Sequence, residues 1–209
     1  MYDGKKNPVW NTIEKMGKGL NVELHHYGDG GIDAAIEGNF KEKIRNTLAP
    51  NEWFIPADLD EFHTVDGYNT FQQLQEDCEA EDADHVMSRF CDHTTEDGSL
   101  LPKLDPNVPI WNQMSRTCNL SEQVLKACCT KFCMVKQNVR VEGGHHGIVD
   151  KDHHKRFSKW GVTHHFKWFG NLYEREKHKL SVHIQKGCVW RAEHIRLLAY
   201  LNAHGGKLL

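Results

Sequence analysis

Two aspartates that follow a short apolar segment are the residues of this chain best suited to chemistry. Residues 53–62 read WFIPADLDEF, so Asp58 and Asp60 stand one residue apart directly after a β-prone run. Alternation along an extended chain would place both carboxylates on one side and Leu59 on the other. Hard divalent cations prefer oxygen ligands, and neighbouring carboxylates repel each other unless a cation or proton lies between them. The motif therefore predicts a metal site, although a bare Asp-x-Asp pair is also common in turns and helix caps.

Histidine is the most unusual feature of the composition. The chain has 15 histidines, several in doublets such as His145-His146 and His164-His165. Zinc-finger spacing is absent, so we expect most of them at the surface or in hydrogen-bonded core positions, and one or two to take part in chemistry. The 7 cysteines form no CxxC pair, which favours reduced thiols in a cytoplasmic protein over a disulfide framework.

Length and charge restrict the class of protein. The 209 residues fit one sizeable domain, which could also be part of a longer polypeptide. The 26 basic and 29 acidic side chains nearly balance, so nothing favours a nucleic acid or a membrane surface as partner. There is no apolar run long enough for a membrane span and no secretory leader, which again predicts a cytoplasmic location.

The elements that must position these residues alternate between strands and helices, which predicts an α/β domain. We expect strands at 21–27, 53–55 and 85–91, and a hairpin of 131–136 with 139–142 that turns at Gln137-Asn138. We expect helices at 32–49, from 69 or 70 to 79, at 171–180 and at 191–203. Prolines and a glycine make 94–110 a long loop, and the polar, basic segment 151–159 is expected to be exposed and mobile.

Four segments in this order resemble glycosyltransferases of the GT-A fold, in the broad family-2-like group. They are WFIPADLDEF (53–62), ADHVMSRFCDHTTEDG (83–98), KQNVRVEGGHH (136–146) and VTHHFKW (162–168). The first is similar to the family's strand with its DXD motif. The resemblance implies a mixed central sheet flanked by helices. A looser resemblance links the chain to small glycosyltransferase domains of large algal viruses such as the chlorella viruses.

The resemblance implies a Mn²⁺ or Mg²⁺ ion that bridges the diphosphate of a UDP-sugar. Asp60 would bind the metal directly, and Asp58 would contact the ribose or a metal-bound water. His145 is the expected third ligand, because Gly143-Gly144 lets the backbone approach and the family places a histidine there. A histidine hydrogen-bonded in a turn is the simpler alternative, and His146 is the nearest competing ligand.

Further residues are expected around the donor. By resemblance, Tyr2 and Asp3 would hold the nucleotide base. His165 and Lys167 fall on one face of their strand, from which a cationic or imidazole group would assist departure of the diphosphate. Arg156 belongs to residues 151–160, which we expect to order over the bound donor as a lid and to exclude water.

An inverting transfer needs a general base on the acceptor hydroxyl. Asp92 is the first candidate because it follows a strand and opens the acceptor-side loop, and Glu96 is the second. Asp97 and Glu61 compete with them, and all of these acids could be solvated loop residues.

These expectations combine into one hypothesis with two alternatives. The hypothesis is an inverting, metal-dependent glycosyltransferase of the hexosyltransferase type. It would move glucose or a deoxyhexose from a UDP-sugar to a carbohydrate acceptor during glycan biosynthesis, and the looser resemblance implies a viral setting. Clustered Asp and His also build the two-metal sites of phosphohydrolases. A non-catalytic sugar- or metal-binding module is the third class.

Overall fold

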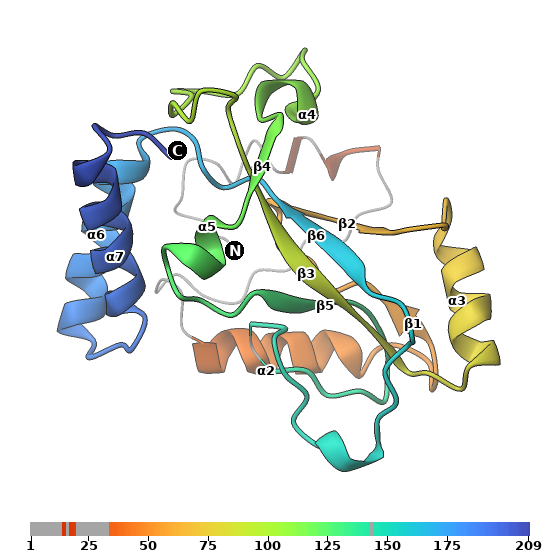
Figure 1. The fold of residues 1–209 in the computed structure, drawn as a ribbon. Coiled ribbons are helices and arrows are strands. Elements are labelled where there is room, and N and C mark those ends of the chain that lie inside the picture. The colour runs from red at the N-terminus through yellow and green to blue at the C-terminus, as the bar shows by residue number, and fades with distance from the viewer. Residues whose placement is uncertain (1–13, 16, 20–33, 143) are drawn as a thin grey trace.

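The computed structural model of the chain describes residues 14–15, 17–19, 34–142 and 144–209, and it shows a curled mixed sheet flanked by helices (Figure 1). The six strands run in the order β1-β5-β3-β6-β2, with β4 paired to β3 off this path. Only β3 and β6 pair in parallel among these strands. Their bounds are β1 Trp53–Phe54, β2 Glu61–Val65, β3 His85–Thr94, β4 Arg116–Cys118, β5 Thr130–Lys136 and β6 Gly161–His165. The expected strand at 21–27, Tyr2 and Asp3 lie outside the described residues.

Helices lie around the sheet and at its two ends. Helix α3 (Phe71–Ala80) lies at one end, and α6 (Leu172–Gln185) and α7 (Arg191–Ala203) lie side by side at the other (Figure 1). Helix α2 (Ala34–Arg45) reaches the β1–β5 side, where the Arg45 guanidinium donates to the Gln137 carbonyl. The described residues also include two single-turn helices, α4 (Ile110–Gln113) and α5 (Leu120–Gln123), and a 3-10 turn η1 (Lys151–His153). No helix of the described residues is long and apolar enough to cross a membrane.

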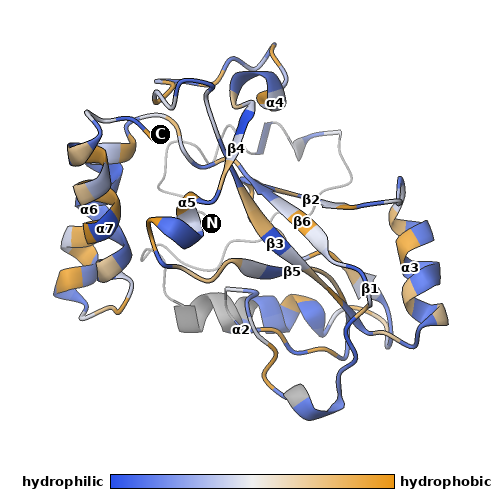
Figure 2. Cartoon of the chain, viewed as in Figure 1, coloured by the Kyte–Doolittle hydropathy of each residue, from blue (hydrophilic) through white to orange (hydrophobic). Residues whose placement is uncertain are grey.

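Local signals account for the helices. Thr70 caps α3, since its hydroxyl accepts a hydrogen bond from the Gln73 N–H at 3.3 Å. Helix α7 has the predicted bounds, and its Leu197 and Leu201 side chains are buried in the cluster beside the sheet. Polar and apolar residues alternate along α3, α6 and α7 (Figure 2), as expected of helices with one face on a core.

The predicted hairpin after β5 is wrong. Strand β5 pairs with β1 and β3 instead, and Val141 makes only an isolated bridge to Ile148. Five successive residues of β5, Lys131 to Val135, are buried. A strand buried on both faces lies inside the sheet, with paired strands beside it and packed residues above and below it. A short local hairpin does not provide this environment.

The segment 151–159 is exposed over most of its described side chains, as predicted, but it is anchored to the fold at several points. Phe157 is 1 % exposed and its N–H donates to the His85 carbonyl at 2.8 Å. Asp84 fastens the same segment, because it accepts a hydrogen bond at 2.7 Å from His154 and its N–H donates to the Lys155 carbonyl. One aromatic side chain in a polar sequence is enough to anchor the segment to the core.

Candidate functional site

The acidic motif is placed by a turn that crosses one face of the sheet. Strands β1 and β2 are the two ends of the strand order, so the residues between them pass from one edge to the other. Asp58 to Glu61 form a turn closed by a hydrogen bond of 3.1 Å from the Glu61 N–H to the Asp58 carbonyl. Leu59 at the tip is 86 % exposed. The two aspartates are therefore separated by a turn and contact different partners, which strand alternation did not predict.

Asp58 is held by a buried lysine. The Lys131 ammonium lies 2.7 Å from Asp58 Oδ2 and 2.6 Å from Glu61 Oε1, and Lys131 is 2 % exposed. Burial would raise the pKa of Asp58, but the charge and hydrogen bond of Lys131 lower it to about 2. Asp58 is thus the ion-pair partner of Lys131. Asp60 makes no such pair with Lys131, and its carboxylate lies beside His165.

Asp60 stands beside a histidine whose ring is oriented by a second carboxylate. His165 Nδ1 lies 2.9 Å from Asp92 Oδ1, and His165 Nε2 lies 3.7 Å from Asp60 Oδ2. In neutral His165 the proton must be on Nδ1, because the Asp92 carboxylate only accepts hydrogen bonds. The Nε2 lone pair is then directed toward Asp60. The parallel pairing of β3 with β6 sets this arrangement, since Asp92 and His165 are register partners.

Asp92 is fully enclosed by donors. Besides His165, it accepts hydrogen bonds from the Ser121 N–H at 2.7 Å, the Ser121 hydroxyl at 2.9 Å and Trp168 Nε1 at 2.9 Å. Burial alone would raise the pKa of Asp92, yet the hydrogen bond and charge of His165 hold it below its usual range. Asp92 is 0 % exposed, which does not fit a base that must touch an acceptor hydroxyl. The geometry fits a residue that positions His165.

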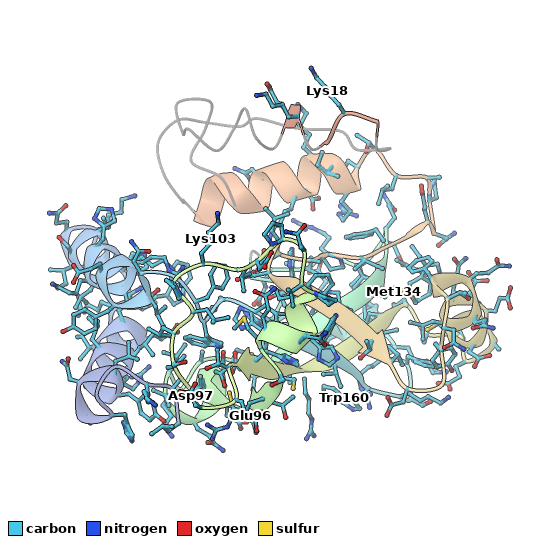
Figure 3. All side chains as sticks on the ribbon, turned by 90° about the horizontal axis from the view of Figure 1, so that it is seen from above. Lys18, Glu96, Asp97, Lys103, Met134 and Trp160 are labelled. Atoms are coloured by element: carbon cyan, nitrogen blue, oxygen red, sulfur yellow. The ribbon has the colours of Figure 1, made fainter. Side chains whose placement is uncertain are left out.

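The second expected base lies in the loop after β3. Glu96 accepts a hydrogen bond from the Ser115 hydroxyl at 3.2 Å and is exposed. Figure 3 shows Glu96 and Asp97 near the outer rim of the molecule. Asp97 accepts hydrogen bonds from Ser99 and Lys207, so it stabilises the loop and the C-terminal tail.

A cavity of about 440 Å³ opens beside His165. Its walls come from the sheet side and from helices α6 and α7, and its lining includes His146, His165 and Lys167 on the first wall and Glu176, Lys179, His183 and His194 on the second. Desolvation lowers the pKa of Lys167 below its usual range, while the charges of Asp92 and Asp60 oppose that shift. A partly buried ammonium group at a cavity wall is suited to an anionic ligand.

His145 is the third expected metal ligand, and it is close enough to Asp58 for their charges to interact. Its backbone has a φ of 59°, its side chain is buried, and Nδ1 has no hydrogen-bond partner among the described residues. Desolvation lowers the pKa of His145 to about 3, and Asp58 and Lys131 are among the charges that act on it. It lines a second cavity of about 330 Å³ together with Pro56, Ala57 and side chains of α2. His146 differs, because its Nδ1 donates to the Thr130 carbonyl at 2.6 Å and its ring lines the larger cavity.

Among the expected donor contacts that the structure describes, Arg156 is the one placed far from this group. It bridges to His85 at the start of β3, and its guanidinium lies 4.8 Å from the Trp160 ring centroid. His85 and Asp92 are seven residue steps apart along β3, which is about 23 Å of extended chain. Arg156 therefore does not join Asp60 and His165.

Sequence reasoning missed Lys131 and the Glu176–His194–His183 series. Glu176 Oε2 lies 2.6 Å from His194 Nδ1, and His194 Nε2 lies 2.9 Å from His183 Nδ1. The signal for Lys131 was a charged residue inside the apolar run TKFCMV. The spacing of Glu176 and His183 on one helix and His194 on the next could have indicated the second group. That spacing predicts a contact only when the two helices are known to pack together.

Comparison with protein-family models, with curated proteins and with solved structures gives no match for this chain.

Proposed function

We propose that this protein is a metal-dependent glycosyltransferase of the GT-A type that transfers a hexosyl group from a UDP-sugar to a glycan acceptor with inversion. The observation that carries the proposal is the series Asp60–His165–Asp92 beside a cavity with a cationic wall. It combines an accessible carboxylate, an oriented imidazole and the Lys167 ammonium. These are the groups that a metal-bound diphosphate requires.

The residues fit a single divalent cation. Two donors that share one ion at bond lengths of about 2.1 Å can lie at most about 4.2 Å apart, and Asp60 Oδ2 and His165 Nε2 are 3.7 Å apart. Manganese accepts both carboxylate oxygen and imidazole nitrogen. A carboxylate behind the ligating histidine, as Asp92 is here, is the usual outer partner of such an imidazole. We assign Asp60 and His165 as the ligands of Mn²⁺ or Mg²⁺.

The chain's own residues would divide the remaining work. The ion, when bound, supplies Lewis-acid stabilisation of the departing diphosphate. Lys167 places positive charge at the cavity wall, where it would stabilise the same leaving group. Lys131 fixes Asp58 and Glu61, and so holds the turn that carries Asp60. His145, whose buried Nδ1 has no hydrogen-bond partner among the described residues and whose ring is within range of the charge of Asp58, remains the candidate for a further ligand.

The wall of the cavity formed by α6 and α7 carries a group that could take the proton from the hydroxyl of the acceptor sugar. His183 ends the hydrogen-bonded series that begins at Glu176, and desolvation lowers the pKa of His183 below its usual value. A neutral imidazole with a carboxylate behind it can take up a proton and be stabilised as the cation. We assign the base role to this series, in place of Asp92.

Titration calorimetry with UDP, GDP and CMP, each with and without Mn²⁺, tests the proposal. We expect UDP to bind only with Mn²⁺, and we expect Asp60→Asn to abolish that binding while far-UV circular dichroism stays unchanged. Asp66→Asn is the matched control, because Asp66 is exposed in the turn after β2. If none of the nucleotides binds, the glycosyltransferase assignment is wrong. Metal-dependent hydrolysis of a simple phosphomonoester would instead favour a phosphohydrolase.

A further inference from the structure

A second group of ligating side chains lies on the other face of the sheet. Cys91 and His164 are register partners on β3 and β6, one residue before the partners Asp92 and His165. Successive residues of a strand point to opposite faces, so Cys91 and His164 face away from Asp60. His93, two residues after Cys91, shares their face. We propose that Cys91, His93 and His164 bind one Zn²⁺ ion.

The donor atoms are close to the arrangement that zinc requires. One ligand atom from each residue, a thiol sulfur and two imidazole nitrogens, can be chosen so that all lie within 4.8 Å of one another. Tetrahedral zinc with bonds of 2.0–2.3 Å keeps its donors about 3.3–3.8 Å apart. His93 Nε2 and His164 Nδ1 are 3.0 Å apart, so shifts of a few tenths of an ångström in the rings and about one ångström in the sulfur complete the set.

The remaining ring nitrogens are engaged by groups that orient the ligands. His93 Nδ1 lies 3.0 Å from the Met114 carbonyl, which only accepts, so the proton of neutral His93 is on Nδ1 and Nε2 presents its lone pair. His164 Nε2 lies 3.0 Å from the Thr64 hydroxyl, which can donate or accept. Imidazoles that ligate zinc commonly have such an outer partner.

The proton balance of binding follows from these contacts. Without metal, the 3.0 Å contact between the rings requires a proton on His164 Nδ1, because His93 Nε2 is the acceptor. With zinc, that proton moves to His164 Nε2, where the Thr64 oxygen accepts it. The Cys91 thiol releases its proton to solvent and binds as thiolate. One proton is therefore released for each ion bound, and no electron is transferred.

Aromatic side chains enclose the site without closing it. Phe166 stacks on His93 with ring centroids 4.3 Å apart, and Trp111 lies 4.8 Å from the His164 ring centroid. Trp111 is 40 % exposed, and Cys91 and His164 are half-buried, so the group is not sealed from solvent. Three protein ligands with one open position is a known zinc arrangement. Since the ligands come from β3 and β6, the ion would also clamp together the two strands that carry Asp92 and His165.

Cobalt titration of the metal-free protein tests the proposal without using any enzyme activity. Tetrahedral Co²⁺ with a thiolate ligand gives visible d–d bands and a near-ultraviolet charge-transfer band. We expect both bands to saturate at one equivalent and to be abolished by one equivalent of Zn²⁺. Cys91→Ser should lose the charge-transfer band. Cys118→Ser, which changes another half-buried cysteine of the sheet, should retain it.

Further variants keep the result decisive if Cys91→Ser disturbs the fold. His164→Gln should also lose the bands, and Thr64→Val, which removes only the outer partner, should weaken cobalt affinity by about 10–100-fold. Asp60→Asn should leave the thiolate charge-transfer band unchanged, which separates this site from the one on the opposite face. Absence of a charge-transfer band in the wild-type protein, or a band that survives both Cys91→Ser and His164→Gln, would overturn the proposal.

Discussion

Replacing Lys131 by methionine is the most demanding test of how the acidic turn is held. The Lys131 ammonium and the Glu61 carboxylate are both enclosed, each with a side chain 2 % exposed, whereas the Asp58 side chain is 41 % exposed. Lys131→Met leaves Glu61 as a buried charge without its partner. Breaking a buried ion pair in this way costs about 3–5 kcal/mol. Asp58 can hydrate and adds little to this cost.

The free energy of unfolding from urea titration measures this cost. For a chain of this size, a loss of 3–5 kcal/mol lowers Tm by about 6–20 °C. Lys136→Met on the same strand is the control, and it should cost about 1 kcal/mol or less, because Lys136 is half-buried and lies 5.2 Å from the Trp53 ring centroid.

The double variant Lys131→Met/Glu61→Gln distinguishes a lost ion pair from lost packing. If the cost comes from the unpaired Glu61 charge, neutralising Glu61 should recover more than half of the stability. A double variant as unstable as Lys131→Met alone, or a single variant within 1 kcal/mol of the wild type, would refute the electrostatic account of the turn.

Three further predictions concern the site and its frame. Asp92→Asn should lower Mn²⁺-supported UDP affinity by about 10–100-fold in calorimetry, because it loosens His165 without removing a ligand; an unaltered affinity would contradict the positioning role. The pKa of Glu176 is about 2 against a usual 4.5, so between these values the unfolded chain binds more protons, and stability falls as pH falls from 4.5 to 2. Glu176→Gln should therefore lower the free energy of unfolding by about 3 kcal/mol at pH 7, and by progressively less as the pH falls from 4.5 to 2. Urea unfolding at each pH measures this difference, and Glu174→Gln, which changes an exposed residue of the same helix, is the control. Phe157→Ala should lower the free energy of unfolding by about 3–5 kcal/mol. In the wild type, hydrogen exchange should find residues 155–158 protected with or without a UDP-sugar. Protection only with the donor would support the hypothesis that this segment is a lid.

The sequence predicted features that depend on neighbouring residues. The start of α3 at residue 69 or 70 and the bounds of α7 follow from residues within one helix; Thr70 is the cap of α3, and the bounds of α7 are confirmed. The contacts that join distant segments were not predictable in this way. Lys131 meets Asp58 and Glu61 across about seventy residues, and no local pattern indicates which strands of a sheet become neighbours.

The same limit explains the outcome at Asp92 and at Phe157. Asp92 follows a regular strand pattern, and its sequence neighbours do not reveal that Ser121 and Trp168 enclose it. Phe157 stands in a polar, basic segment, so composition predicted an exposed loop, although its ring is buried against Tyr68. Burial depends on the partner surface, which only the assembled fold supplies.

The His164-His165 doublet has a consequence for insertions and deletions in β6. Because β3 and β6 are paired in parallel, a single deleted or inserted residue would move every β6 side chain to the opposite face of the sheet. In one direction His164 would face Asp92 and Thr163 would stand beside Cys91. In the other, His165 would stand beside Cys91 and Phe166 would face Asp92. Each one-residue shift thus exchanges the faces of His164 and His165 and leaves an imidazole beside only one of Asp92 and Cys91, so such variants would keep a histidine partner at one site and lose it at the other.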